Sequence, residues 1–282
     1  MSLRIGTRGS ALALAQARTV AEALGGELVT ITTAGDVNRA AGDKSRWTGA
    51  LEQALLAGEI DLAVHSAKDV PGELAEGTEL VAAPPRADPR DVLVGAPDLN
   101  ALPAGSRVGT SALRRRAQLL AARPDLDVVE LRGNVDTRLR KLREGEVDAL
   151  VLAAAGLERL GVAEGVPLDF VPAPGQGILA LQARAGDDRA IHSGLLHPRT
   201  FGCLLAERAA VVALGATCHT PVGVHAVVTH DYRMRLQGFA GRPDGSEWVL
   251  DEHESDANTP EEAGRELAQR MLAAGAGEIL AQ

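Results

Sequence analysis

The chain has 282 residues, of which 45% are hydrophobic and 24% charged, values typical of a globular protein with two or three domains. Aromatic residues make up only 2% and the net charge is −9, which argues against a partner nucleic acid or anionic membrane. No apolar run reaches the roughly 18–20 residues of a membrane span and no signal-peptide pattern opens the chain, so we expect a cytoplasmic protein. The two cysteines, Cys203 and Cys218, form no disulfide framework, and no Cys/His spacing predicts a metal site.

The basic residues are unevenly distributed. Only three of the 29 basic residues are lysines. Because Ala, Gly and Leu are also abundant, this excess of arginine over lysine is explained by a GC-rich coding sequence. Between Arg107 and Arg143, however, nine Arg and one Lys face four acidic residues, a local balance of +6 in an acidic chain. This concentration predicts a pocket for a small polyanion.

The first part of the chain alternates short β-rich runs with helical patterns, which is typical of α/β architecture. Ser10 and Gly25 have the residue types of a helix N-cap and C-cap, and they bracket one amphipathic run. The predicted strands are Leu3–Thr7, Glu27–Thr33, Asp61–His65 and Leu80–Ala83, and the predicted helices are Ala11–Leu24 and Leu51–Ala57.

A second α/β unit begins near Asp91. Its predicted strands are Val92–Val94, Arg107–Gly109, Val128–Leu131 and Ala149–Leu152, and its predicted helices are Ala112–Ala122, Val135–Arg143 and Ala153–Leu160. Pro167–Gly177, with the sequence PAPGQG, is predicted to be a loop. A strand Ile178–Gln182 and a helix around Asp188–Leu196 would then return to the first unit.

The last part of the chain, from about residue 199, does not alternate strands with helices as the first two units do. Its strands follow one another and lie between helices, as in a small α+β domain. Its predicted elements are a helix Leu204–Leu214, strands Val222–Thr229, Met234–Phe239 and Trp248–Asp251, and a helix from about Pro260. We therefore expect three domains: residues 1–86 with 177–198, residues 87–176, and residues 199–282.

Several basic and hydroxyl residues follow predicted strands at the point where a helix begins. Helix N-termini present unpaired N–H groups to anions, and open α/β sheets bind ligands at the carboxyl ends of their strands. Most of these residues alone are more simply explained as a helix cap or a solvated charge. Arg114 and Arg115 are the exception, because they oppose the helix dipole in the first turn and an anionic ligand would remove that conflict. Arg159 lies near the end of its helix, and the recurrence of such sites favours a binding site. The candidates are Arg8, Ser10, Thr110, Ser111, Arg114, Arg115, Arg132, Arg138 and Arg159.

Two further short segments carry chemistry. His65–Pro71 closes a strand and places Asp69 beside Lys68, which suits a positioned acid or base as well as a plain surface pair. Cys218 follows the helix-ending Gly215 in a loop, where a thiol is either reactive or inert. Cys203, in an apolar helical stretch, fits the inert case better.

Nine motifs together resemble the hydroxymethylbilane synthase (porphobilinogen deaminase) family over nearly the whole chain. They occur in the family's order: IGTRGSALALAQA, DLAVHSAKDVP, DPRDVLVG, VGTSALRRRAQL, LRGNVDTRLRKL, LAAAGLERLG, PAPGQG, LAERAA and TCHTPVG. The resemblance implies two α/β domains like type II periplasmic binding proteins, with the active site between them, and a small C-terminal α+β domain. It also implies a transferase of tetrapyrrole biosynthesis, which condenses four porphobilinogen units into hydroxymethylbilane.

The resemblance also implies the roles of individual residues. Cys218 would carry a covalent dipyrromethane cofactor, and Asp69 would be the catalytic carboxylate. The residues implied to bind the cofactor are Ser66, Lys68, Thr110, Ser111, Arg114 and Arg115. Those implied to bind substrate and the growing chain are Arg8, Ser10, Arg132, Arg138 and Arg159. A monomer that passes its product to uroporphyrinogen-III synthase is expected.

Substrate chemistry accounts for these residue types. Each porphobilinogen carries an acetate and a propionate, and buried carboxylates need arginine partners. Loss of ammonia leaves a cationic azafulvene, which a carboxylate such as Asp69 can stabilise. No metal or nucleotide is required.

The chain departs from the family pattern at three places: Ala112 replaces a usual serine, Gly215-Ala216-Thr217 replaces a Gly-Gly, and Asp43–Thr48 replaces the usual lid sequence. The alternative function is a non-enzymatic cytosolic receptor for a small polycarboxylate, which would need neither Cys218 nor Asp69.

Overall fold

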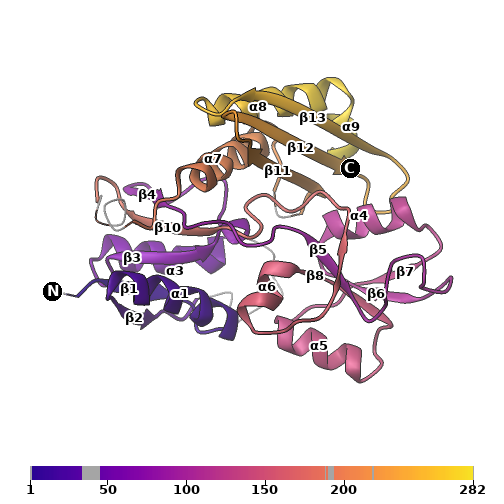
Figure 1. Cartoon of the computed structure of the whole chain (residues 1–282), viewed down its shortest axis with the longest axis horizontal. Coiled ribbons are helices and arrows are strands. Elements are labelled where there is room, and N and C mark those ends of the chain that lie inside the picture. The colour runs from indigo at the N-terminus through magenta and orange to yellow at the C-terminus, as the bar shows by residue number, and fades with distance from the viewer. Residues whose placement is uncertain (1, 34–44, 188, 190–193, 218, 282) are drawn as a thin grey trace.

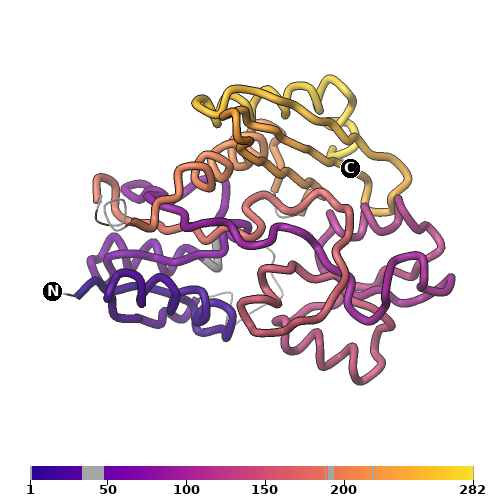
Figure 2. Tube along the Cα trace, in the orientation of Figure 1, coloured from indigo at the N-terminus to yellow at the C-terminus, as the bar shows by residue number. Residues whose placement is uncertain are grey.

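The computed structural model describes residues 2–33, 45–187, 189, 194–217 and 219–281, without the side chains of residues 45–47 (Figures 1 and 2). Cys218 therefore lies outside the described residues, as do Asp43 and Lys44 of the atypical segment and residues 188 and 190–193 of the helix predicted around Asp188–Leu196.

The first unit is built on a five-stranded sheet of order β2-β1-β3-β10-β4. Its strands are β1 (Arg4–Thr7), β2 (Glu27–Thr30), β3 (Leu62–Ser66), β4 (Thr78–Ala82) and β10 (Leu179–Arg184). β1 is parallel to β2 and β3, whereas β10 is antiparallel to β3 and β4. Because side chains alternate along β3, Leu62 and Val64 pack with α1 (Ala11–Leu24), and Ala63 packs with α3 (Ser45–Leu56) on the other face.

The second unit repeats this plan with a sheet of order β7-β6-β8-β5-β9. Its strands are β5 (Asp91–Val94), β6 (Arg107–Gly109), β7 (Asp127–Val129), β8 (Ala149–Ala153) and β9 (Val166–Leu168), and its helices are α4 (Leu113–Ala122), α5 (Val135–Arg143) and α6 (Ala154–Arg159). β6 is parallel to β7 and β8, and β5 is antiparallel to β8 and β9.

The fourth strand is antiparallel to its neighbours in both sheets: β10 in the first and β5 in the second. β5 is the first strand after the chain crosses from the first unit to the second, and β10 is the first strand after it crosses back. Two such sheets joined by two crossovers form the type II periplasmic-binding-protein-like pair that the resemblance implied. Parallel strands put their carboxyl ends at one edge, so both units can direct loops into the space between them.

The third unit is an antiparallel sheet of order β11-β12-β13 covered on one face by helices. Its elements are α7 (Pro198–Ala213), β11 (Val222–Val228), β12 (Arg233–Gly241), β13 (Trp248–Asp256), α8 (Pro260–Ala273) and α9 (Ala276–Leu280). Figure 1 shows it lying over both other units. Leu204 of α7 packs with Val70 and Ile178 of the first unit, and Phe239 of β12 packs with Ala117 of α4. We propose that the three units are the domains, divided at the boundaries predicted from the sequence.

The predicted elements agree closely with the structure at α1, β6 and α5, whose bounds are those expected. The loop prediction from Pro167 was wrong at its start, because β9 runs to Leu168; a proline on an edge strand concealed it. β13 also runs on to Asp256, past the predicted end at Asp251, because this edge strand continues through charged residues.

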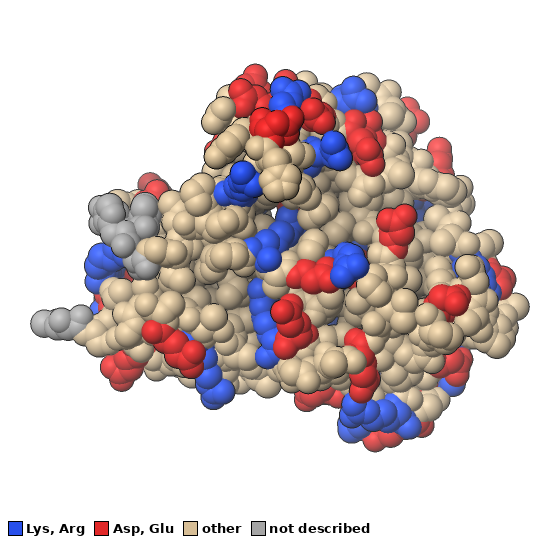
Figure 3. Space-filling view, viewed as in Figure 1, with Lys and Arg blue, Asp and Glu red and all other residues tan. Residues whose placement is uncertain are grey.

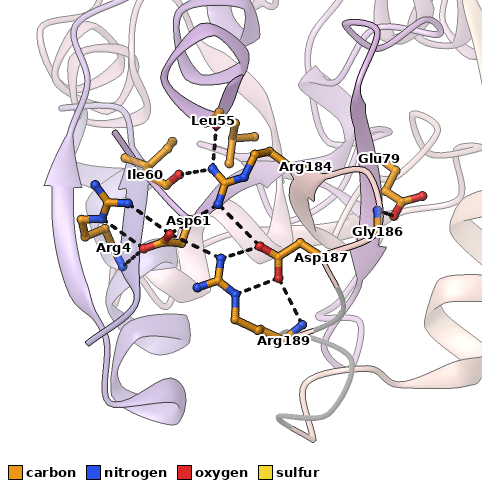
Figure 4. A network of polar contacts seen from close by, with 9 residues as sticks. All are labelled: Arg4, Leu55, Ile60, Asp61, Glu79, Arg184, Gly186, Asp187 and Arg189. Carbon is orange, nitrogen blue, oxygen red and sulfur yellow. Dashed lines mark hydrogen bonds and ion pairs between the residues drawn. The ribbon is translucent and has the colours of Figure 1, made fainter. Parts of the chain in front are cut away.

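Ion pairs and hydrogen bonds stabilise the first sheet at the amino ends of β1 and β3 (Figure 4). Asp61, which precedes β3, accepts hydrogen bonds from the backbone N–H and the guanidinium of Arg4 at 3.0–3.1 Å. Arg184, at the end of β10, donates to the carbonyl oxygens of Leu55 and Ile60. Hydrogen bonds from Arg4 hold the pKa of Asp61 well below its usual range. These contacts leave the ligand-facing ends of the strands free for other groups.

Glu207 of α7 contacts both segments that connect the first and second units, at Arg86 and at Gly175, and also contacts β11 of the third unit. Its carboxylate is fully buried and accepts hydrogen bonds from Arg86 at 2.6 Å and from the N–H groups of Gly175 at 2.6 Å and Ala226 at 2.8 Å. Burial by itself would raise the pKa of Glu207, but the Arg86 guanidinium holds it below the usual value. Glu207 is thus a charged junction of all three units.

We expect Glu207→Gln to lower the free energy of unfolding by about 3–5 kcal/mol, because it leaves the buried Arg86 guanidinium without its counter-charge. Thermal unfolding measures the effect. Glu266→Gln is the matched control: the side chain of Glu266 is 42% exposed and binds His253 and Ser255, so a loss below about 1 kcal/mol is expected. Equal melting temperatures for both variants would contradict the junction role of Glu207.

Candidate active site

A cavity of about 490 Å³ opens where the three units meet. The first unit contributes the turn from Ala67 to Gly72, the second contributes Ser111–Arg115 and Arg138, and the third contributes α7 and the loop after it. The crossover segment Ala173–Gln176 completes the wall. The cavity therefore brings together part of the predicted set of strand-end residues: Lys68, Asp69, Ser111, Arg114, Arg115 and Arg138.

Five basic side chains line this cavity: Lys68, Arg114, Arg115, Arg138 and Arg208. Figure 3 shows Lys and Arg side chains gathered along the groove between the two lower parts of the molecule. Acidic residues lining the same cavity are fewer, Asp69 being the only one among those the structure describes. The cavity is electropositive and suits a ligand with several carboxylates.

Arg114 and Arg115 share a buried carboxylate. Asp91, at the start of β5, is fully buried and lies 2.7 Å from the Nη1 of Arg114 and 2.8 Å from the Nη2 of Arg115. Burial would raise the pKa of Asp91, but the two guanidiniums hold it far below its usual value. One carboxylate against two guanidiniums leaves a net positive charge facing the cavity. No sequence pattern predicted this pairing, although Asp91 belongs to the DPRDVLVG motif.

Gln176 fixes the same cluster from the crossover. Its side-chain amide donates to Asp91 at 3.0 Å and to the carbonyl oxygen of Pro89 at 2.6 Å. The neighbouring Gly175 has φ +74, and a Cβ there would stand 2.8 Å from the Cβ of Ala67. Only glycine lets the PAPGQG loop pass this close to the turn that carries Lys68 and Asp69.

Thr110 and Ser111 behave differently from each other. Ser111 lines the cavity, and its hydroxyl accepts a hydrogen bond from Arg138 at 3.0 Å. Thr110 is buried, and its hydroxyl accepts from the N–H of Ala112 at 3.2 Å. The backbone donor at Ala112, where the family usually has serine, is thus bound within the turn. Burial lowers the pKa of Arg138 to about 10, and repulsion from Arg115 adds to this; Arg138 stays charged at neutral pH.

The turn after β3 places Lys68 and Asp69 on the cavity wall. Burial lowers the pKa of Lys68 to about 8, against the attraction of Asp69, so its ammonium is close to titration near neutral pH. Asp69 also borders a second, smaller cavity of about 50 Å³, which Arg8, Ser10 and Ser66 line. Asp69 is the acidic group that connects the two spaces.

The smaller cavity lies at the carboxyl ends of β1 and β3. Ser10 caps α1, accepting from the N–H of Ala13 at 3.2 Å, and Ser66 exchanges hydrogen bonds with Gln16 at 2.8 and 3.1 Å. Beneath them, His65 is bound to Gln182 at 2.9 Å, and burial lowers its pKa to about 4, so the ring is neutral near pH 7.

Three predicted binding residues do not line either cavity: the buried Thr110, Arg132 and Arg159. Arg132 is exposed and pairs with Glu130 at 2.6 Å. Arg159 is partly buried and donates to the carbonyl oxygen of Gly177 at 2.8 Å, so it touches the crossover beside the cavity.

The loop that contains the predicted attachment cysteine borders the cavity. Cys218 itself is outside the described residues, but Ala216, Thr217 and Thr220 line the cavity wall. The loop is braced by Thr220, whose hydroxyl lies 2.7 Å from the carbonyl oxygen of Thr217. Cys203, by contrast, is only 5% exposed, as expected, and burial raises the pKa of its thiol to about 11.

Arg208 is a cavity residue that sequence reasoning missed. It extends from α7, donates to the carbonyl oxygen of Gly72 at 2.8 Å, and brings a positive charge from the third unit. The one available signal was a charged pair, Glu207-Arg208, inside an otherwise apolar helix.

Within the described part of the chain, no group of three His, Cys, Asp or Glu side chains is arranged to hold a metal ion. In the same residues, no helix is long and apolar enough to cross a membrane. The fold and the cavity define the class: two binding-protein-like α/β units and an α+β unit around an electropositive cavity, with Asp69 as the one acidic residue in its described lining.

Comparison with known proteins identifies the family. Residues 3–192 match the profile "Porphobilinogen deaminase, dipyromethane cofactor binding domain", and residues 201–273 match "Porphobilinogen deaminase, C-terminal domain". The chain is 47% identical to porphobilinogen deaminase of Thermus thermophilus over 294 residues, covering 99% of this chain and 98% of that protein. It is 48% identical to porphobilinogen deaminase of Rubrobacter xylanophilus over 296 residues, covering 99% and 96%. The chain belongs to the porphobilinogen deaminase family.

Solved structures of solute-binding proteins are more distant. The ancestral cationic amino acid solute binding protein AncCDT-1 covers 68% of this chain and 86% of its own, at 16% identity and a TM-score of 0.43. The second substrate-binding domain of Lactococcus lactis GlnP covers 76% and 90%, at 12% identity and a TM-score of 0.42.

Proposed function

We propose that this chain catalyses the reaction of its family, the stepwise condensation of four porphobilinogen units into hydroxymethylbilane with release of ammonia. The observation that carries the proposal is the larger cavity, whose lining brings together five basic side chains, Asp69 and residues that flank Cys218. A polycarboxylate chain and a cationic intermediate both find complementary charge there.

The cavity fits a dipyrromethane cofactor. Its volume of about 490 Å³ lies in the range of sites for small organic ligands. The side chains that would hold the cofactor's carboxylates are Lys68, Ser111, Arg114 and Arg115, and Arg208 stands on the facing wall. Thr110 would act through the turn it braces. When bound through the Cys218 sulfur, the cofactor supplies a pyrrole with a free α-carbon as the primer.

Asp69 is proposed as the catalytic carboxylate. As ammonia leaves porphobilinogen, positive charge develops on the pyrrole of the substrate, and a carboxylate at that point lowers the barrier. Asp69 borders both cavities, so a substrate with its ring in the larger cavity and one carboxylate arm in the smaller one would present its reacting end to this group. The partly buried Lys68 beside it balances the charge of Asp69 between turnovers.

Substrate and growing chain are assigned to Arg8, Ser10, Arg138, Arg159 and Arg132. Arg8 and Ser10 line the smaller cavity, and Arg138 lines the larger. Arg159 lies at the crossover and Arg132 at the surface, so we assign them to later carboxylates of the elongating chain. The protein is further proposed to act as a cytoplasmic monomer and to pass its product to uroporphyrinogen-III synthase.

The direct test is incubation of purified protein with porphobilinogen, following ammonia release and the linear tetrapyrrole. We expect one ammonia for each porphobilinogen consumed. Tight binding of porphobilinogen without ammonia release would favour the alternative, a receptor for a small polycarboxylate.

The arginines should divide by reaction step. Arg114→Ala and Arg115→Ala should impair assembly of the cofactor, because each leaves Asp91 with one guanidinium and alters the wall beside the primer. Arg8→Ala and Arg159→Ala should keep the cofactor and stop elongation early. Native mass spectrometry with limiting porphobilinogen counts the pyrroles added to each variant. Arg143→Ala, at an exposed pair with Glu164, is the control. Identical ladders for the control and the four variants would contradict the assignment.

A further inference from the structure

Thr48 has a buried hydroxyl with no partner. Its side chain stands near the start of α3, is 1% exposed, and has no hydrogen-bond partner among the described residues. Leaving a hydroxyl unpaired in the interior costs about 1–3 kcal/mol, so such a group normally indicates a strained or functional position.

The hydroxyl belongs to the wall of the smaller cavity. Thr48 lines this space together with Arg8, Ser10, Ser66 and Asp69. At about 50 Å³ the space exceeds the roughly 30 Å³ that one water occupies in the liquid, and it suits a small polar group rather than a whole ring. Since Asp69 also borders the larger cavity, the smaller one is a side chamber of the proposed active site.

The other hydroxyls in this chamber already have partners. Ser10 accepts from the N–H of Ala13, and Ser66 exchanges hydrogen bonds with Gln16. Thr48 is the one hydroxyl lining the chamber for which the described residues provide no acceptor or donor.

The charges around the chamber determine what the hydroxyl can meet. Arg8 contributes a positive charge, and the His65 ring, whose Nε2 is bound to Gln182, contributes a neutral wall. Asp69 stands at the boundary with the larger cavity. A carboxylate entering on the Arg8 side would accept from the Thr48 O–H, while a cationic group would lie towards Asp69.

We propose that Thr48 is a substrate-binding residue, whose hydroxyl donates a hydrogen bond to one carboxylate arm of the incoming porphobilinogen. This inference rests on the proposed function. It places the arm inside the side chamber and leaves the reacting end of the pyrrole beside Asp69.

Thr48→Val tests the proposal, because valine keeps the shape and removes the donor. We expect KM for porphobilinogen to rise about tenfold or more, as for a lost hydrogen bond to a charged group, while the covalent cofactor is retained. The melting temperature of the substrate-free protein should stay the same or rise, because a buried unpaired hydroxyl is gone. Thr48→Ser should keep KM near the wild-type value. Thr19→Val, an exposed threonine on α1, is the matched control for the substitution itself.

Substrate analogues identify the contact independently. With analogues in which the acetate or the propionate is replaced by an uncharged alkyl group, Thr48→Val and wild type should differ for one analogue and not for the other. If Thr48→Val does not fold, Thr48→Ala is compared with Thr48→Ser in the same assays. Wild-type protein that releases no ammonia overturns the proposed function. Active wild type with an unchanged KM in Thr48→Val, or equal effects of serine and valine, overturns only the role of Thr48.

Discussion

Replacing Asp69 by asparagine is expected to reduce ammonia release by at least about 100-fold, the usual scale of a lost charge-stabilising or acid–base group. Asparagine keeps the size of the side chain but cannot balance the positive charge that develops on the substrate pyrrole. Because Asp69 sits on a short turn beside a wide cavity, the fold and the cofactor should be retained. Steady-state turnover and the intact mass of the variant measure the two outcomes.

The control for Asp69→Asn is Asp125→Asn, which removes an exposed carboxylate paired with Arg123 outside both cavities. It should leave turnover near wild type. An Asp69→Asn protein that carries the cofactor and keeps more than about a tenth of wild-type turnover would contradict the catalytic role, since it falls short of the expected 10²-fold effect.

Replacing Cys218 by serine is expected to abolish both the covalent cofactor and product formation. A thioether needs a thiol accessible to the electrophile formed from porphobilinogen, and the residues flanking Cys218 line the cavity. Serine at this position is a far weaker nucleophile, so no primer is retained. Ammonia release and the mass of the peptide containing residue 218 are the two measurements.

Cys203→Ser is the matched control, because the chain has one other cysteine. Cys203 packs in the core of the third unit, and burial raises its pKa to about 11, so its thiol is protonated at neutral pH and shielded from the cavity. We expect this variant to keep the cofactor. An adduct that disappears with Cys203→Ser and persists with Cys218→Ser would keep the enzyme and contradict the choice of cysteine.

The sequence predicted the elements and the gathering of the site where a local rule was sufficient. Ser10 and Gly25 bracket α1 because both act on the backbone of their own turn. Lys68 follows β3 of the first sheet, and Ser111 and Arg114 follow β6 of the second. Each motif was predicted to bind ligand because it stands at the carboxyl end of its own strand, and the two ends line one cavity because the two units face each other.

Contacts between distant segments could not be predicted in this way. Asp91 and Arg114 are 23 residues apart, and nothing in either motif shows that the carboxylate is buried between two guanidiniums. Arg208 reaches the cavity only because the third unit packs against the first. Arg132 and Arg159 were predicted to bind ligand from motifs like those of the cavity residues, but neither lines the cavity. Arg132 pairs with Glu130, and Arg159 donates to the carbonyl oxygen of Gly177.

The intact mass of purified wild-type protein, expressed with ample porphobilinogen, shows whether Cys218 carries the covalent dipyrromethane of an active enzyme. We expect a single species heavier than the polypeptide by two pyrrole units, with the added mass on the peptide that contains Cys218. Limiting porphobilinogen should then produce a ladder of further single-unit additions. A wild-type protein with the unmodified polypeptide mass would contradict the enzyme and favour the receptor.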